Sequence, residues 1–327
     1  MTEPQLNEKV QQLIKKAEAL QPNGIEIQYH DEKSGFVRHD QAQHFLRNGK
    51  LVIDVLDQTD VNYIVSHELL HFMLMFEKLP QIAFNLESGR QKLDTKYTAT
   101  GMELYDILMH FFVYDRQREL GLIDDQVEDL YFKGILAVLK PEPQDHQDDW
   151  MVLRTVNLLD ALIFFKDQQD NVLPKLRELY PKATAQAEKL YAIVTAKPLD
   201  SAFNVRRAIV KLYKGFDEAL KSYGLYEMNL NSYVSLTPVL SDRQLRLEVR
   251  QLFEIFHTDM KENLHFRTAY IGRMKNDQQN VFVIPEPKGS EQQRSVEFRH
   301  IYETPVGEYL DSIGVPYLKR QLSNGGG

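Results

Sequence analysis

Two histidines and a glutamate in the segment His67-Glu68-Leu69-Leu70-His71 have types and spacing suited to metal-dependent hydrolysis. An α-helix has about 3.6 residues per turn, so His67 and His71 share one face and their imidazoles can bind one ion. Glu68 lies beside the first histidine, where it can take a proton from a water whose pKa a zinc ion lowers toward about 7. The segment therefore predicts a zinc-dependent hydrolase with Glu68 as the general base.

The residues around this segment predict a buried helix that follows a strand. Residues 51–56 are apolar enough for a buried strand. A helix can begin at Thr59 or Asp60, and Pro80 must end it. This helix is apolar on almost every side, so we expect it to run through a core. Two histidines and a glutamate inside it are costly unless a metal ion, or separate hydrogen-bond partners, satisfy them.

These residues resemble the zincin metallopeptidases, in which a strand is followed by a helix that carries His-Glu-x-x-His. The resemblance covers residues 25–120. It implies that His67 and His71 bind zinc and that Glu68 is the catalytic base. It also implies that the strand at 51–56 aligns an extended substrate.

A catalytic zinc site needs a third protein ligand and an open fourth position. The metzincin pattern is not met, because Leu74 and Glu77 stand where it requires a glycine and a histidine. Resemblance to the gluzincins implies a glutamate on a second helix, and a helix expected over 99–119 carries Glu103. We expect Glu103 to be the third ligand, with His110 as the alternative. Seven residues of helix separate their backbones by about 10 Å, so both cannot easily bind one ion.

Composition limits the classes of function that this chain can have. Its 327 residues are 43% hydrophobic, which suits a soluble globular protein. The chain has no cysteine, so disulfides and thiolate zinc ligands are excluded, and a reducing cytosolic compartment fits. A formal net charge of −8 argues against general binding to nucleic acid or to an anionic membrane. No secretory pattern and no apolar run of about 20 residues is present, so we expect a cytosolic protein.

The order of sequence patterns predicts three segments. Residues 1–139 contain the strand signals and the two site helices, and form the expected zincin-like core. Residues 140–262 begin with a polar, proline-bearing stretch and look almost wholly helical, as an insertion or as a second domain. Residues 263–327 return to strand-like runs at 281–284 and 295–298, which can rejoin the core.

Together these patterns predict an α+β protein that is predominantly helical, with a strand-plus-helix active-site core. The expected function is that of a zinc-dependent metallopeptidase acting on a peptide or protein substrate. One alternative is a non-catalytic interaction protein in which zinc braces the helices or the site is vestigial. Another is a zinc hydrolase of a small amide or ester.

Overall fold

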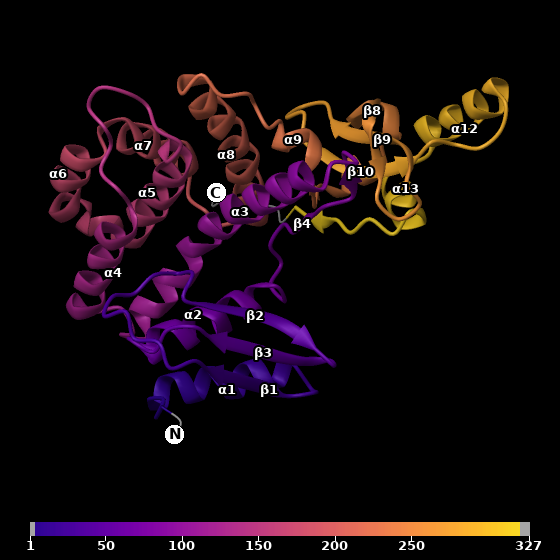
Figure 1. Ribbon diagram of the computed structural model, residues 1–327. Helices are drawn as coiled ribbons and strands as arrows, with labels where there is room; N and C mark the ends of the chain where they lie inside the picture. The colour runs from indigo at the N-terminus through magenta and orange to yellow at the C-terminus, as the bar shows by residue number, and fades with distance from the viewer. Residues whose placement is uncertain (1–3, 321–327) are drawn as a thin grey trace, which may run out of the picture. The chain divides into compact units, whose positions relative to one another are not determined.

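The computed structural model describes residues 4–320, which form a mixed fold of helices and strands in which helix predominates (Figure 1). The predicted α+β class is therefore confirmed. The chain divides into two compact units, Met1–Glu77 with Ile107–Tyr191, and Lys78–Asp106 with Ala192–Gly327. Across the described part of the chain, none of the helices combines the length and apolar composition that a membrane crossing requires.

This division differs from the three segments expected from the sequence. Residues 140–191 belong to the first unit, where α5 (Met151–Phe165) packs against α4 (Asp125–Val138). The segment from residue 263 onward belongs to the second unit, where its strands pair with β8 (Phe253–Glu262). The long-range pairing of these strands decides the division, and local sequence patterns do not encode it.

A three-stranded sheet with the order β1-β3-β2 lies at the base of the first unit. The strand β1 (Ile25–Tyr29) runs parallel to β3 (Lys50–Val55), which occupies most of the strand expected over 51–56. The third strand, β2 (Ala42–Arg47), is antiparallel to β3 and is joined to it by the turn Asn48-Gly49. Both turn residues have positive φ, 54° and 79°, which a two-residue hairpin of type I′ requires.

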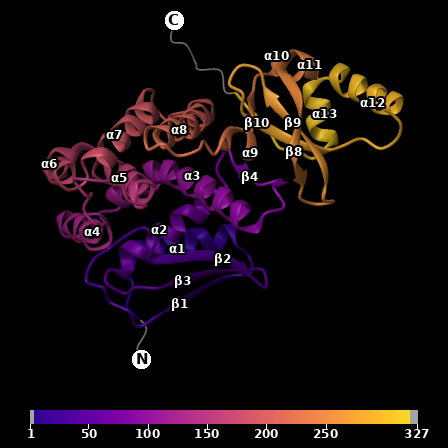
Figure 2. The same cartoon turned by 45° about the horizontal axis from the view of Figure 1, so that its top comes forward.

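The helix α2 (Val61–Leu74) carries the histidine pair and packs against this sheet and against α1 (Glu8–Leu20) (Figure 2). It begins as predicted, because the Asp60 side chain accepts a hydrogen bond from the Tyr63 backbone N–H at 2.9 Å. Its residues from Tyr63 to Leu70 are all buried, so the expected core helix is confirmed. Its regular turns end at Leu74, before Pro80.

The first unit contains several further helices. They include the part of α3 (Gln91–Glu119) that follows residue 106, together with α4, α5, the short 3-10 turn η1 (Lys166–Gln168), α6 (Gln169–Leu179) and α7 (Pro181–Thr195). Residues 169–195 form two helices rather than one, since Pro181 starts α7. Nearly every side chain of α5 is buried.

The second unit contains a four-stranded antiparallel sheet with the order β10-β9-β8-β5. Its core is a cluster of buried apolar side chains from the sheet and from the C-terminal helices, among them Phe253, Phe282 and Leu310. The elements of this unit are the first part of α3, β4 (Ile82–Ala83), β5 (Leu86–Glu87), α8 (Ala202–Ser222), α9 (Leu230–Tyr233), β6 (Ser235–Leu236), β7 (Val239–Leu240), α10 (Asp242–Leu245), α11 (Val249–Leu252), β8, β9 (Arg267–Met274), β10 (Asn280–Pro285), α12 (Glu291–Glu303), α13 (Val306–Ser312) and β11 (Leu318–Lys319).

Two segments of this unit differ from the sequence expectation. Residues 253–260, expected to be helical, lie in β8, where burial alternates along the strand. Residues 295–298, expected to be a strand, lie in the helix α12. A capping box between Ser290 and Gln293 starts that helix and outweighs the short strand-like run within it.

A glycine in β9 is required by close packing across the sheet. A Cβ atom at Gly272 would overlap the ring of Phe282, which is fully buried on β10. We expect Gly272→Ala to destabilise the second unit by about 1–3 kcal/mol, measured by urea denaturation. The control is Gly307→Ala, where the new Cβ would make only ordinary contacts of 3.4–3.6 Å. Equal stability of Gly272→Ala and the parent would contradict this expectation.

Candidate metal centre

Three histidines of the first unit come together between two helices. His67 and His71 lie on α2 and His110 on α3, and each offers one ligand atom within 4.8 Å of the other two. The ring centroids are 4.7 Å apart for His67 and His71, 4.9 Å for His67 and His110, and 5.0 Å for His71 and His110. With zinc–nitrogen bonds of about 2.0 Å, tetrahedral ligands lie roughly 3.3 Å apart. Small side-chain rotations would therefore let all three bind one ion.

The structure does not place Glu103, the expected third ligand, in this group. Glu103 is half-buried on α3, seven residues before His110, and it belongs to the second compact unit. The alternative ligand, His110, is the residue that meets the pair on α2. Because one helix carries both side chains, their separation of roughly 10 Å lets only one of them lie beside the pair.

The environment of the histidine pair suits a metal ion. Burial lowers the pKa of His67 well below its ordinary value, and the neighbouring His110 lowers it further. Burial, followed by the proximity of His67, likewise lowers the pKa of His71. Both imidazoles are therefore neutral at pH 7, which is the form that binds a metal. The Nδ1 atom of His67 is also buried without a hydrogen-bond partner, so the cluster has unsatisfied polar capacity.

A buried carboxylate on α5 orients the third histidine. The Oδ1 atom of Asp160 lies 2.5 Å from Nδ1 of His110, and its Oδ2 atom lies 3.0 Å from Nδ1 of His39. Burial by itself would raise the pKa of Asp160, but the charges and hydrogen bonds of His110 and His39 hold it well below its ordinary value. An ionised Asp160 fixes the proton of His110 on Nδ1 and leaves Nε2 for a metal.

Two phenols complete the surroundings of this carboxylate. The hydroxyl of Tyr114 donates to Oδ2 of Asp160 at 3.0 Å, and the hydroxyl of Tyr131 donates to the same atom. Asp160 is fully buried, and these donors compensate for the water that it has lost. The ring of Tyr114 also lies 4.8 Å from that of His110, centroid to centroid.

Loss of the Asp160 charge is expected to weaken metal binding. Asp160→Asn keeps the size of the side chain, but it no longer holds the proton of His110 on Nδ1. We expect zinc affinity to fall by about 10–100-fold, measured by competition with a chromophoric chelator. Asp115→Asn is the control, because that carboxylate is partly exposed and pairs with Lys166. An unchanged affinity in a folded Asp160→Asn variant would show that the carboxylate does not orient a ligand.

The expected catalytic base lies at the same site. Glu68 is 6% exposed and directly follows His67 on α2. Its Oε2 atom is 2.6 Å from Nδ1 of His44, which lies on β2. The ring of His44 stacks at 6.4 Å from that of His71. A strand and a helix therefore hold the carboxylate beside the histidine cluster.

Three residues of this site were missed in the sequence: His39, His44 and Asp160. The pair Asn48-Gly49 is a strong hairpin signal, and it would have shown that His44 lies on a strand next to the one at 51–56. A lone aspartate in the apolar run Leu158–Phe165 signals a buried charge that needs partners. No comparable local pattern marks His39.

Comparison of the chain with protein-family models, curated proteins and solved structures found no match. The zincin resemblance therefore stays a prediction from the motif. The chemistry of the site rests on the geometry of its own residues.

Proposed function

We propose that this protein is a zinc-dependent metallopeptidase of the zincin type, with His67, His71 and His110 as the metal ligands. The proposal depends chiefly on one observation: the three imidazoles meet within 4.8 Å, with the carboxylate of Glu68 next in sequence to one of them. Three protein ligands leave the fourth zinc position open, as in catalytic rather than structural sites. A bound zinc ion would lower the pKa of a water molecule and polarise a substrate carbonyl.

The protein's own side chains would then handle the proton. Glu68 accepts a proton from the attacking water and delivers it to the leaving amine. The hydrogen bond from His44 fixes the direction of the Glu68 carboxylate, and Asp160 fixes that of His110. Glu68, His110 and Asp160 are buried, which keeps bulk water away from them and strengthens their electrostatic interactions.

An extended peptide is the substrate class that fits the neighbouring sheet. The strand expected to align it, at 51–56, is β3, which is the central strand and is paired on both edges. Within the described sheet, β1 and β2 are the two edge strands, and β2 is the one that carries His44 beside Glu68. A peptide backbone that adds to the outer edge of β2 would pass next to the metal centre.

Zinc removal gives the direct test of this proposal. We expect the zinc-loaded protein to cleave members of a fluorescence-quenched peptide library, to lose that activity on treatment with a chelator, and to regain it with zinc. The added zinc restores activity because the ion supplies the Lewis acid that the side chains lack. A protein that holds one zinc ion and cleaves no member of the library, nor casein, would instead be the non-catalytic, zinc-braced alternative.

The setting of this activity is part of the same proposal. We propose a cytosolic location, a peptide or protein substrate, and no nucleic-acid or membrane partner. The lack of cysteine supports the location, and the acidic composition argues against nucleic acid and anionic membranes as partners. Fractionation of cells that express the tagged protein would test the location.

A further inference from the structure

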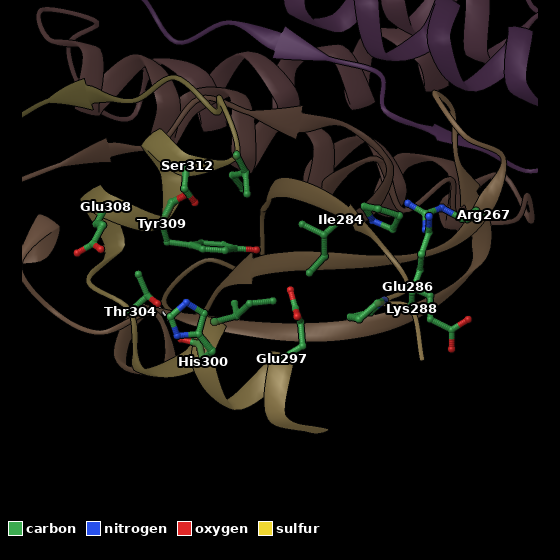
Figure 3. A pocket seen from close by; sticks show the side chains of 14 residues that line it. Arg267, Ile284, Glu286, Lys288, Glu297, His300, Thr304, Glu308, Tyr309 and Ser312 are labelled. Atoms are coloured by element: carbon green, nitrogen blue, oxygen red, sulfur yellow. Dashed lines mark hydrogen bonds between the residues drawn. The ribbon is translucent and has the colours of Figure 1, made fainter. Parts of the chain in front are cut away.

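A second candidate site lies within the second unit, in a pocket of about 530 Å³ between the end of β10 and the helices α12 and α13 (Figure 3). Its volume is typical of pockets that bind small molecules. Ile284 and Ile301 give it apolar walls, and both are 7% exposed. Every residue that lines it lies between Arg267 and Ile313, so it shares no residue with the histidine cluster.

A phenol hydroxyl inside this pocket has no partner. Tyr309 is 5% exposed, and its hydroxyl oxygen is buried without a hydrogen bond. Figure 3 shows its ring lying across the pocket, with the hydroxyl directed toward Ile284. Burial, and then the negative charge of Glu297, raise the pKa of Tyr309 well above its ordinary value, so the hydroxyl keeps its proton. A buried hydroxyl without a partner is costly, and a ligand could satisfy it.

Unpaired charges of both signs also line the pocket. The carboxylate of Glu297 extends from α12 into the space near Tyr309, while Arg267 and Lys288 lie on the other side of Ile284 (Figure 3). Within residues 4–320, these three charged side chains form no ion pair. Glu286, which also lines the pocket, is already paired with Arg294 at 2.7 Å and does not neutralise the two cations.

We propose that this pocket binds a small zwitterion of the amino-acid or short-peptide class. The ligand's ammonium group donates to the Glu297 carboxylate and to the Tyr309 hydroxyl oxygen, whose own proton is then free for a ligand carbonyl. The ligand's carboxylate binds Arg267 and Lys288, and its apolar part covers Ile284. Charge-assisted hydrogen bonds of this kind are the strong ones, and they require both termini of the ligand to be free.

Calorimetry with defined probes tests this assignment. The full chain with Glu68→Gln is used, so that no probe is cleaved whatever the activity of the metal centre. We expect saturable binding of the dipeptide alanyl-leucine or of free leucine, and the tighter of the two identifies the source of the zwitterion. Acetylation of the amine should abolish binding, and amidation of the carboxylate should weaken it by about 10-fold.

Variants separate a ligand contact from a structural role. Glu297→Gln, at an exposed position, should weaken binding by about 10-fold, and Arg267→Gln by a similar factor. Tyr309→Phe should weaken binding without lowering the melting temperature, because the unpartnered hydroxyl contributes no contact to the free protein. Glu303→Gln, also exposed on α12 but outside the pocket, should bind as the parent does. Absence of saturable binding of both probes at millimolar concentration, or equal binding of the acetylated probe, would overturn the proposal.

Discussion

A Glu68→Gln variant is expected to retain its zinc and to hydrolyse peptides about 1,000-fold more slowly than the parent. The amide is nearly the same size as the carboxylate, so the buried position beside His67 stays filled. An amide cannot accept the proton of the attacking water, and it cannot deliver a proton to the leaving amine. The rate on a quenched peptide measures the loss, and plasma mass spectrometry measures the zinc in the same preparation.

The control for this result is a glutamate just beyond the same helix. Glu77 follows α2, is exposed, and forms an ion pair with Arg116 at 2.7 Å. Glu77→Gln should keep the parent rate, because surface pairs of this kind contribute little. Turnover near the parent rate in the zinc-loaded Glu68→Gln variant would refute the role of Glu68 as the base.

The second large effect is expected at the third ligand. His110→Ala should abolish stoichiometric zinc binding, whereas Glu103→Ala should leave it intact. The reason is that His110 lies with His67 and His71 within 4.8 Å, while Glu103 is not part of that group. Zinc per protein chain, determined by plasma mass spectrometry after dialysis, distinguishes the two ligands.

A folding control is needed here, because His110→Ala removes one partner of the buried Asp160. His71→Ala is the second test, since His71 is only half-buried and has no such partner. It should lose zinc with an unchanged circular dichroism spectrum. Loss of zinc in Glu103→Ala together with its retention in His110→Ala would restore the ligand set first expected from the sequence.

Local signals in the sequence predicted the helix of the histidine pair well. Asp60, one of the two expected helix starts, begins α2 by accepting a hydrogen bond from the Tyr63 backbone N–H at 2.9 Å. The position of His67 and His71 on one face follows from helical periodicity alone. Features of this kind depend on neighbours within four residues, and the sequence displays those directly.

The features that local sequence patterns did not predict depend on contacts between distant residues. Asp160 approaches His110 across 50 positions of sequence, and His44 approaches Glu68 across 24. The choice of His110 over Glu103 depends on which turn of α3 lies beside α2, and periodicity does not encode that. Local patterns also predicted a helix where β8 lies. The segment is a strand because its pairing with β9 overrides local propensity.

The most direct test of the central claim is X-ray absorption at the zinc K-edge on the zinc-loaded protein. We expect the zinc ion to have three imidazole nitrogens at about 2.0 Å and one oxygen ligand from water. In His110→Ala protein reconstituted at high zinc concentration, one of the three imidazoles should be lost. A spectrum with two imidazoles and a carboxylate, or with four protein ligands and no water, would contradict an open three-histidine site. Two imidazoles and a carboxylate would assign the third ligand position to a carboxylate such as Glu103. Four protein ligands without water would indicate a structural zinc.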